Sequence, residues 1–510
     1  MLQNILNLIL ILFLIPILPE KNMKLGTKLF VLIVFPLLFF FCSKKEQSFS
    51  KDIEIQDFIW KGMNSYYFWQ SNVPNLSDTR FDSQSQLNDF LQGYDSPEEI
   101  FEALRYQPGV VDRFSWIVDD YIALENSFQG INVSTGMDFG LRRYNNNPTN
   151  VYGYVRYVIP NSSAASKAVK RGMIFNTING IQLTDRNYQN LLFDTSTSLD
   201  VGFANFNDGN PISNDISITL SKEENTENPI AISKIIEEGN KKIGYLLYNQ
   251  FSSSYDDQLN AVFNSFKNEN IDDLIIDLRY NGGGSVNTAT YLGSMITGQF
   301  TGELYSKEVW NNKIKNAYSE DVFFNYFTDE IKKTDQNENV ITQEPINSLN
   351  LTSVYFIVSG SSASASELVI NSLRSYIDVK LIGTTTVGKQ VGSVTLYDSD
   401  DFRRNGKNLK TTHTYAIQPI VLEISNKDNL NEPNGFTPGT TLPGIPIAEN
   451  TGNLGVLGEY SDPLLNRTIE YLTTGSKGIS KIKTLKFSDF YNSKLANPAS
   501  NNMYLDLRSK

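Results

Sequence analysis

The amino-acid sequence predicts an α/β multi-domain protein, and three observations support this fold class. The 510 residues exceed what one hydrophobic core usually organises, so about three domains are expected. Hydrophobic residues make up 40% of the chain and charged residues 20%, which is typical of globular proteins. The apolar pattern also changes twice along the chain, from helical to strand-rich and then to alternating strands and helices.

The first 42 residues predict an export and anchoring segment. The apolar run 29–41 follows Lys24 and Lys28, and it is shorter than the roughly 20 residues that a membrane-spanning helix needs. It ends at Cys42, where a bacterial lipoprotein signal carries its lipid-modified cysteine. A lipidated Cys42 would tether the chain to a membrane surface, and we therefore expect an exported protein of a bacterial periplasm or cell envelope. An uncleaved anchor helix stays the alternative, because Phe41 stands where such signals usually have a small residue.

Residues 52–126 predict an N-terminal helical domain. Ser96 fits a helix N-cap, because Pro97 and Glu98 follow it in the first turn, where a fixed φ and a negative charge are favourable. The aromatic clusters at 58–60 and 66–69 are interpreted as core residues rather than as a ligand-binding site.

Residues 127–224 predict a β-rich domain of short strands and tight turns. Alternating side chains predict strands at 152–159 and 172–178, with a short helix at 164–169 between them. Asn179-Gly180 predicts a tight turn after the second strand.

Residues 225–474 predict a layered βαβ domain. Strands are expected at 243–249, 274–278, 354–358 and 379–383, and helices at 256–266, 288–296 and 365–376. In open α/β sheets, reacting groups collect just past the carboxyl ends of the strands. Residues 475–510 show no clear period and are interpreted as a partly mobile C-terminal tail.

Charge and residue counts exclude several classes of function. The formal net charge of -12 argues against a nucleic-acid partner, because phosphate binding requires a basic face. A single cysteine excludes an internal disulfide and a cysteine-rich zinc site. A single histidine, His413, excludes a metal site with several histidine ligands. We therefore expect neither a metal ion nor another cofactor.

A serine at a predicted strand-to-helix corner is the first candidate for chemistry. Ser364 lies in the run 361–367, directly after the strand expected at 354–358. The first N–H groups of a helix have no acceptor inside it and can bind a developing oxyanion. An ordinary helix N-cap is the competing interpretation.

Lys389 is the second candidate, just past the strand expected at 379–383. A serine hydroxyl is a weak nucleophile and needs a base, and a lysine becomes one when desolvation lowers its pKa. Val387, Gly388 and Val391 surround Lys389 in the sequence without a nearby acid, which favours a neutral amine. A surface lysine is the competing interpretation.

Three glycines at 282–284 form the third candidate, past the strand expected at 274–278. Glycines let the main chain approach a ligand closely, and here they could supply a second oxyanion donor. No Gly-Lys-Ser/Thr follows, so a phosphate-binding loop is not expected. Asp277 and Arg279 are expected to pair and to fix the loop rather than to react.

Together these segments resemble the C-terminal processing (tail-specific) serine peptidase family. The resemblance rests on Asp-Leu-Arg-x-Asn-x-Gly-Gly, Ser-Ala-Ser-Ala-Ser-Glu and Gly-Lys, in that order, within residues 270–393. It implies a crotonase/ClpP-like layered catalytic domain, with Ser364 as nucleophile and Lys389, 25 positions later, as general base. It also implies an oxyanion hole made by the N–H of Ala365 and that of Gly283 or Gly284, of which Gly283 is favoured.

The residue that orients this pair stays open. Many members of the family carry a glutamine four residues after the lysine, whereas this chain has Ser393 there and Gln390 next to the lysine. Ser393, Gln390 and Glu367 are the candidates.

The β-rich region resembles a PDZ domain, as expected for this family. The run 136–141 resembles the carboxylate-binding loop, which assigns binding of a peptide carboxylate to Asp138, Phe139, Gly140 and Leu141. A PDZ domain binds a chain end by adding it as a strand. The resemblance therefore implies that this domain captures polypeptide tails for Ser364.

The sequence thus predicts a serine endopeptidase that cleaves polypeptides near their C-terminus through an acyl-enzyme. Three rivals remain: a non-catalytic peptide-binding lipoprotein that retains the fold, a Ser-His hydrolase that uses His413, and a scaffold that works through the PDZ-like domain alone. The physiological substrate, the cleavage preference, the membrane concerned and the formation of an oligomer stay open.

Overall fold

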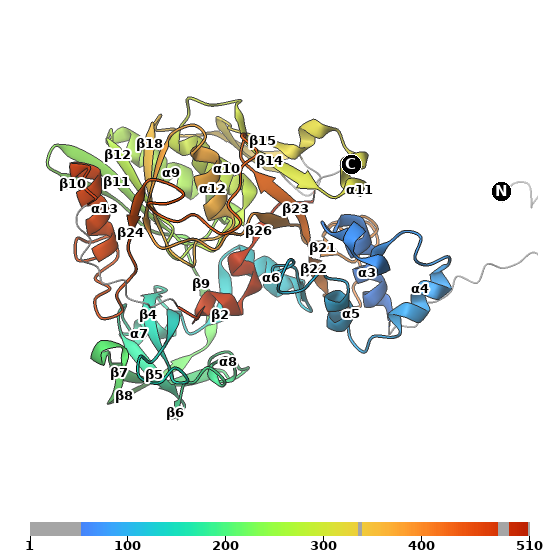
Figure 1. Cartoon of the computed structure of the whole chain (residues 1–510), viewed down its shortest axis with the longest axis horizontal. Helices are drawn as coiled ribbons and strands as arrows, with labels where there is room; N and C mark the ends of the chain where they lie inside the picture. The colour runs from blue at the N-terminus through green and yellow to red at the C-terminus, as the bar shows by residue number, and fades with distance from the viewer. Residues whose placement is uncertain (1–52, 335–338, 478–488, 508–510) are drawn as a thin grey trace, which may run out of the picture. The chain divides into compact units, whose positions relative to one another are not determined.

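The computed structural model describes residues 53–334, 339–477 and 489–507 (Figure 1). The chain divides into two units between Glu54 and Ile55, and the second unit, Ile55–Lys510, is compact. The predicted anchor segment 1–42, with Cys42, lies outside the described residues, and every contact given below belongs to the second unit.

The predicted N-terminal helices are α3 (Glu54–Tyr66), α4 (Gln84–Leu91), α5 (Pro97–Ala103) and α6 (Tyr121–Phe128). The hydroxyl of Ser96 accepts a hydrogen bond from the Glu99 N–H at 3.2 Å, which confirms the predicted N-cap of α5. In the aromatic clusters, Phe58 and Tyr67 are buried, as a core interpretation requires.

The β-rich domain is built on a seven-stranded sheet. The order is β25-β3-β4-β5-β7-β8, and β6 also pairs with β5. The bounds are β3 (Met137–Arg143), β4 (Val151–Val158), β5 (Ile174–Ile178), β6 (Ile181–Gln182), β7 (Ser198–Asn205), β8 (Ile212–Ser221) and β25 (Tyr491–Asn492), with helices α7 (Ser163–Ser166) and α8 (Tyr188–Leu192). Asn179 and Gly180 adopt φ angles of 52° and 74°, which confirms the predicted tight turn between β5 and β6.

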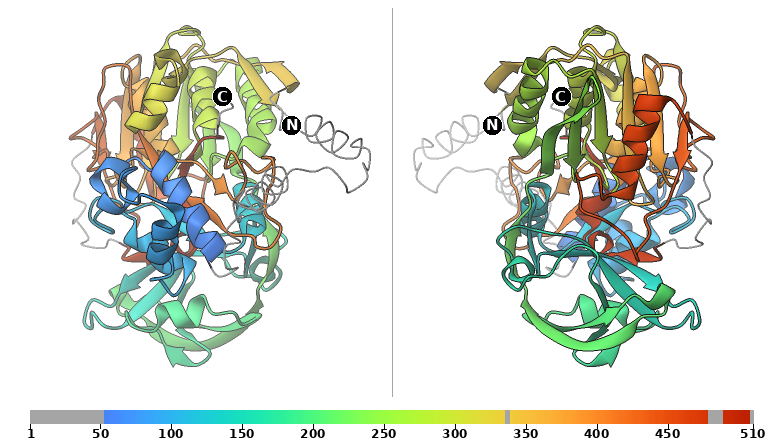
Figure 2. Two further views of the ribbon diagram at one scale, coloured as in Figure 1. Left: turned by 90° about the vertical axis from the view of Figure 1, so that its right-hand side faces the viewer. Right: turned by 90° about the vertical axis from the view of Figure 1, so that its left-hand side faces the viewer.

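The βαβ domain contains the largely parallel sheet β10-β11-β12-β18-β19-β24. The strands are β10 (Ile230–Glu238), β11 (Lys241–Tyr248), β12 (Asp273–Asp277), β18 (Ser353–Val358), β19 (Asp378–Gly383) and β24 (Gly444–Pro446). Helices α9 (Asp256–Asn268), α10 (Val286–Ile296) and α12 (Ala365–Leu373) lie on one side of the sheet, and α13 (Pro463–Thr474) packs on the other (Figures 1 and 2). This layering confirms the predicted α/β multi-domain fold.

A second six-stranded sheet of the same unit has the order β13-β26-β20-β23-β14-β15. Its strands are β13 (Gly284–Ser285), β26 (Met503–Tyr504), β20 (Val391–Ser393), β23 (Ile420–Ser425), β14 (Leu304–Trp310) and β15 (Phe324–Tyr326). Smaller pairings join β1 (Trp116–Val118), β22 (Ala416–Gln418) and β21 (Leu396–Tyr397), then β2 (Ile131–Ser134) with β9 (Glu223–Thr226), and β16 (Glu330–Thr334) with β17 (Val340–Pro345). Helix α11 (Asn312–Ala317) follows β14.

The end of the chain differs from the expected aperiodic tail. Residues 489–507 contribute β25 to the β-rich domain and β26 to the second sheet, with two short 3-10 helices, Ser493–Ala496 and Pro498–Asn501, between them. Both strands have only two residues, so they leave no hydrophobic period that a sequence pattern could reveal.

Candidate active site

Ser364 stands at the corner between β18 and α12, as predicted. Its main chain has φ 65° and ψ -118°, a conformation that a residue with a Cβ rarely adopts and that costs about 1–3 kcal/mol. The side chain is fully buried, and its Oγ makes no hydrogen bond to any part of the chain that the structure describes. Such strain and an unpaired buried hydroxyl are typical of a functional site.

Glu367, one turn into α12, connects Ser364 to Lys389. Its carboxylate accepts hydrogen bonds from the N–H groups of Ser364 at 2.9 Å, Gly388 at 2.7 Å and Lys389 at 2.8 Å, and from the hydroxyl of Thr386. Burial raises the pKa of Glu367, while these donors oppose that rise. One carboxylate therefore fixes the main chain of both predicted reactive residues.

Lys389 is buried, with 1% of its surface exposed. Burial lowers the pKa of its amine from 10.5 to about 7, whereas the negative charges of Asp112 and Glu367 act to raise it. The Nζ lies 4.9 Å from the ring centroid of Phe114 and donates a hydrogen bond to the carbonyl of Asn501 at 2.6 Å. The environment therefore favours an amine that is largely neutral at slightly alkaline pH.

The glycine loop is held by the predicted ion pair. The Arg279 Nε lies 2.9 Å from a carboxylate oxygen of Asp277, and both side chains are fully buried. The N–H of Gly283 donates to the side-chain oxygen of Asn281 at 2.9 Å, so this donor is engaged within the loop. Gly284 lies in β13 with φ 139°.

The other two candidates for an orienting residue make different contacts. Ser393 donates to the side-chain oxygen of Asn502 at 2.7 Å and accepts from Gln418 Nε2 at 3.2 Å. The side-chain oxygen and nitrogen of Gln390 have no hydrogen-bond partner within the described ranges. Among the three candidates, Glu367 alone bonds to both Ser364 and Lys389.

Several residues of this site are not predicted from the sequence. Phe114 and Asp112 come from the N-terminal region, and Asn501 and Asn502 come from the end of the chain. No spacing links these residues to the lysine. Gln418 is a buried polar residue in β22. A glutamine in an otherwise apolar strand is the one local sequence signal that could indicate a residue of this site.

His413 is engaged away from Ser364. Its Nε2 lies 3.1 Å from a carboxylate oxygen of Asp398, and its Nδ1 accepts from the N–H of Tyr415 at 3.1 Å. Both ring nitrogens therefore have partners of their own.

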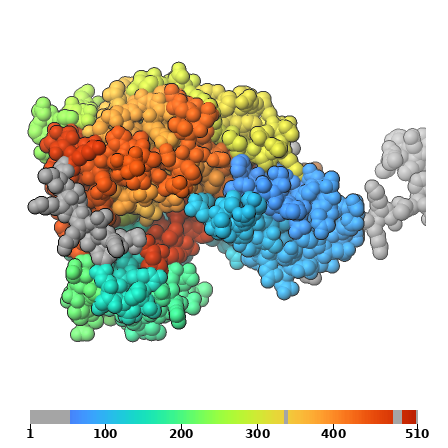
Figure 3. Space-filling view, in the orientation of Figure 1, coloured from blue at the N-terminus to red at the C-terminus, as the bar shows by residue number. Residues whose placement is uncertain are grey.

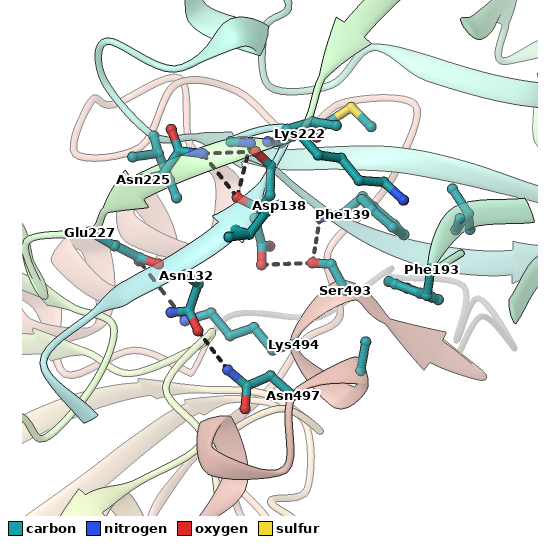
Figure 4. A pocket seen from close by; sticks show the side chains of 18 of the residues that line it. Asn132, Asp138, Phe139, Phe193, Lys222, Asn225, Glu227, Ser493, Lys494 and Asn497 are labelled. Carbon is teal, nitrogen blue, oxygen red and sulfur yellow. Dashed lines mark hydrogen bonds and ion pairs between the residues drawn. The ribbon is translucent and has the colours of Figure 1, made fainter. Parts of the chain in front are cut away.

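The four residues assigned to peptide binding lie in β3 of the β-rich domain (Figure 4). The carboxylate of Asp138 pairs with Arg156 and accepts a hydrogen bond from the Ser493 hydroxyl at 2.9 Å, while the N–H of Phe139 donates to that hydroxyl at 3.0 Å. Gly140 and Leu141 pair in antiparallel register with β25. A cavity of about 510 Å³ is lined by Asp138 and Phe139, but not by Gly140 or Leu141.

The layered α/β domain thus carries a buried serine at a strand-to-helix corner and a buried lysine past the neighbouring strand. Residues 242–429 match the model of peptidase family S41, and residues 54–116 match the peptidase S41 N-terminal domain. The chain therefore carries both domains of peptidase family S41, a family of serine-type peptidases.

Of two solved structures that are similar to this chain, the first shares its fold. An S41-type protein from Bacteroides fragilis is 22% identical, with a TM-score of 0.59 over 82% of this chain and 97% of its own. The photosystem II D1 C-terminal processing protease is 14% identical, with a TM-score of 0.46 over 82% of this chain and 99% of its own. A search of curated proteins finds no significant match.

Two absences hold for residues 53–334, 339–477 and 489–507. No helix there is long and apolar enough to cross a lipid bilayer. No group of three or more His, Cys, Asp or Glu side chains there could hold a metal ion.

Proposed function

We propose that the chain is an endopeptidase that cleaves polypeptides near their C-terminus, with Ser364 as nucleophile and Lys389 as general base. The observation that carries this proposal is the shared carboxylate of Glu367, which holds the main-chain N–H groups of both residues. A buried amine with a pKa of about 7 supports the role of the lysine, because a base works best when its pKa is near the working pH.

The reaction follows from these positions. The neutral Nζ of Lys389 takes the proton of the Ser364 hydroxyl while Oγ bonds to the substrate carbonyl carbon. The peptide C–N bond then breaks, and the lysine ammonium gives its proton to the leaving amine. Water, deprotonated by the same amine, hydrolyses the remaining ester and frees the hydroxyl.

The negative oxygen of the intermediate needs two main-chain donors. Ala365 is the first residue of α12, so its N–H has no acceptor within the helix. The second donor is the N–H of Gly283 or that of Gly284. The Gly283 N–H donates to the Asn281 side chain, whereas Gly284 pairs with Met503 of β26.

The β-rich domain is proposed to capture substrate tails as a PDZ-like domain. Support comes from the edge of β3 that faces away from β4, where β25 pairs in antiparallel register with Gly140 and Leu141. Helix α8 closes the other side of that groove, as the contact of Tyr188 with Tyr491 indicates, with ring centroids 5.0 Å apart. A polypeptide end bound here would be added as a strand.

Peptide cleavage tests the proposal. Unstructured peptides are incubated with the parent chain and with the variants Ser364→Ala and Lys389→Ala, and the products are identified by mass spectrometry. Both variants should lose activity while they keep the far-ultraviolet circular dichroism of the parent. Near-normal cleavage by Lys389→Ala would reject the Ser-Lys pair.

A serine-directed acylating probe separates the peptidase from the rival that binds peptides without cleaving them. The peptidase should be labelled at Ser364, and the label should be absent from Lys389→Ala. A chain that binds peptides but takes no label would be the non-catalytic lipoprotein.

Membrane attachment through a lipid on Cys42 stays a proposal, because this residue lies outside the described ranges. Growth of a bacterial host with a labelled fatty acid should label the parent chain and leave Cys42→Ser unlabelled. Equal labelling of both would reject a lipid on this cysteine.

A further inference from the structure

Residues 489–507, called here the C-terminal segment, contact both sites that a substrate would use. The segment contributes β25 to the β-rich domain and β26 to the sheet beside Ser364. Part of it is exposed on the face in Figure 3, where it is red. Its contacts at each site are those of a bound peptide.

At the β-rich domain, the segment pairs with β3 as an added strand. Tyr491 lies opposite Leu141 in antiparallel register, and the N–H of Phe490 donates to the Leu141 carbonyl at 3.1 Å. The rings of Phe490 and Tyr491 pack on Tyr188 of α8, with centroids 5.2 Å and 5.0 Å away. The groove between β3 and α8 is thus filled in the way that strand addition fills it.

At the reactive serine, β26 lies between β13 and β20, in parallel with both. The Oγ of Ser364 and the carbonyl oxygen of Asn502 both lie within 3.0 Å of the point where a Cβ of residue 283 would stand. A main-chain carbonyl of the segment therefore lies beside the nucleophile, where a substrate carbonyl has to lie.

The amine of Lys389 is hydrogen-bonded to the same segment. Its Nζ donates to the carbonyl of Asn501 at 2.6 Å, while the Ser364 Oγ has no hydrogen-bond partner in the described part of the chain. No hydrogen bond joins the Lys389 Nζ to the Ser364 Oγ while the segment is in place. The carbonyl of Asn502 is thus held next to a nucleophile that is not activated.

Burial shows how firmly the segment covers the site. Ala499, Asn502 and Met503 are almost completely buried, and the ring of Tyr504 stacks on Phe128 with centroids 4.4 Å apart. Ser364 is fully buried beneath them. A second peptide can reach the serine only after the segment has moved away.

We propose that the C-terminal segment is a built-in pseudosubstrate that holds the activity of the peptidase low, and that a polypeptide which displaces it from β3 activates the enzyme. This inference rests on the proposed function of Ser364 and Lys389. The cavity of about 510 Å³ that borders Phe139, Phe193 and Ser493 offers an incoming extended peptide a first place to bind beside the segment (Figure 4). Displacement would then proceed along β3, because both peptides compete for the same strand edge.

The test uses the full chain with the segment weakened at either site. Met503→Asp places a charge at a position with 1% exposure, so β26 should leave the sheet. Phe490→Pro removes the N–H that bonds to Leu141 and acts far along the segment from the serine. Leu495→Asp is the matched control, because this residue of the same segment is 43% exposed.

Each of the first two variants should cleave an unstructured peptide at least tenfold faster than the parent, and Leu495→Asp should match the parent. A synthetic peptide of residues 489–507 should inhibit Met503→Asp competitively. The two variants act on different domains, so a folding defect in one leaves the other as the test.

Three results would overturn the inference. Equal cleavage rates for the parent and for a folded variant, with Ser364 labelled by the acylating probe in both, would remove the pseudosubstrate and keep the proposed peptidase. Spontaneous cleavage of the parent between Asn502 and Met503 would make the segment a substrate. If Ser364 takes no label and no peptide is cleaved even in the weakened variants, the proposed function fails, and the inference fails with it.

Discussion

The buried amine of Lys389 gives a prediction that does not depend on catalysis. Replacing it by methionine keeps a long unbranched side chain and removes the titrating group. In the folded chain the pKa of Lys389 is about 7, against 10.5 for an exposed lysine. Between these two values the unfolded chain binds more protons than the folded chain, so the stability of the parent rises with pH across this window.

The size of the effect follows from about 1.36 kcal/mol per pKa unit. Keeping the lysine buried costs the parent about 4 kcal/mol at pH 7.5 and about 1.4 kcal/mol at pH 9.5. The stability advantage of Lys389→Met should therefore shrink by about 2.5 kcal/mol between these two pH values. The packing energy of the methionine is the same at both pH values, so it cancels when the two stability differences are subtracted.

Equilibrium unfolding in urea, followed by tryptophan fluorescence, measures the effect for the parent and for Lys389→Met at both pH values. Lys267→Met is the control, because Lys267 is exposed on α9 and its ammonium is in water in both states. The stability difference of the control should not change with pH. An equally constant difference for Lys389→Met would show that the amine is not neutral in the folded chain, and the reasoning on the base would fall.

Four further predictions concern the same site. Glu367→Gln should lower kcat about 100-fold with little change in KM, because an amide cannot accept all the donors that position both reactive residues. The kcat/KM of the parent should rise with pH and level off above about pH 7, as the Lys389 amine loses its proton; a flat profile between pH 6 and 8 would contradict this. Gly284→Ala should lower the free energy of unfolding by about 3 kcal/mol or more, since its Cβ would lie 2.1 Å from the Phe251 carbonyl oxygen, whereas Gly360→Ala has its nearest heavy atom at 3.9 Å and should change stability by less than about 0.5 kcal/mol. His413→Ala should cleave peptides within about twofold of the parent rate, because Asp398 and Tyr415 already occupy its ring; a large loss would revive the Ser-His mechanism.

The positions of Ser364 and Lys389 could be predicted because the signals are local. Each follows a short apolar strand, and β18 and β19 are neighbours in parallel register, so that their carboxyl ends deliver both loops to the same edge of the sheet. The predicted pairing of Asp277 with Arg279 is likewise a contact between residues two positions apart.

The remainder of the site depends on contacts between distant residues. Phe114 reaches Lys389 from the N-terminal region, and Asn502 reaches Ser393 from the other end of the chain. The hydrogen bond that the Gly283 N–H donates to the Asn281 side chain is likewise not revealed by any pattern of residues. Two-residue strands such as β25 are formed by partners already in place rather than by any propensity of their own.

The carboxylate of Glu367 also explains how the site can be inactive while Ser364 and Lys389 are already positioned. Glu367 holds the main chains of Ser364 and Lys389, so their relative position does not depend on a bond between the two side chains. When Asn501 leaves, the lysine Nζ loses its acceptor on the Asn501 carbonyl, and its side chain is free to adopt another rotamer. Activation would then require no change in the fold of the βαβ domain, and its barrier would be set by the contacts that hold the C-terminal segment on β3 and between β13 and β20.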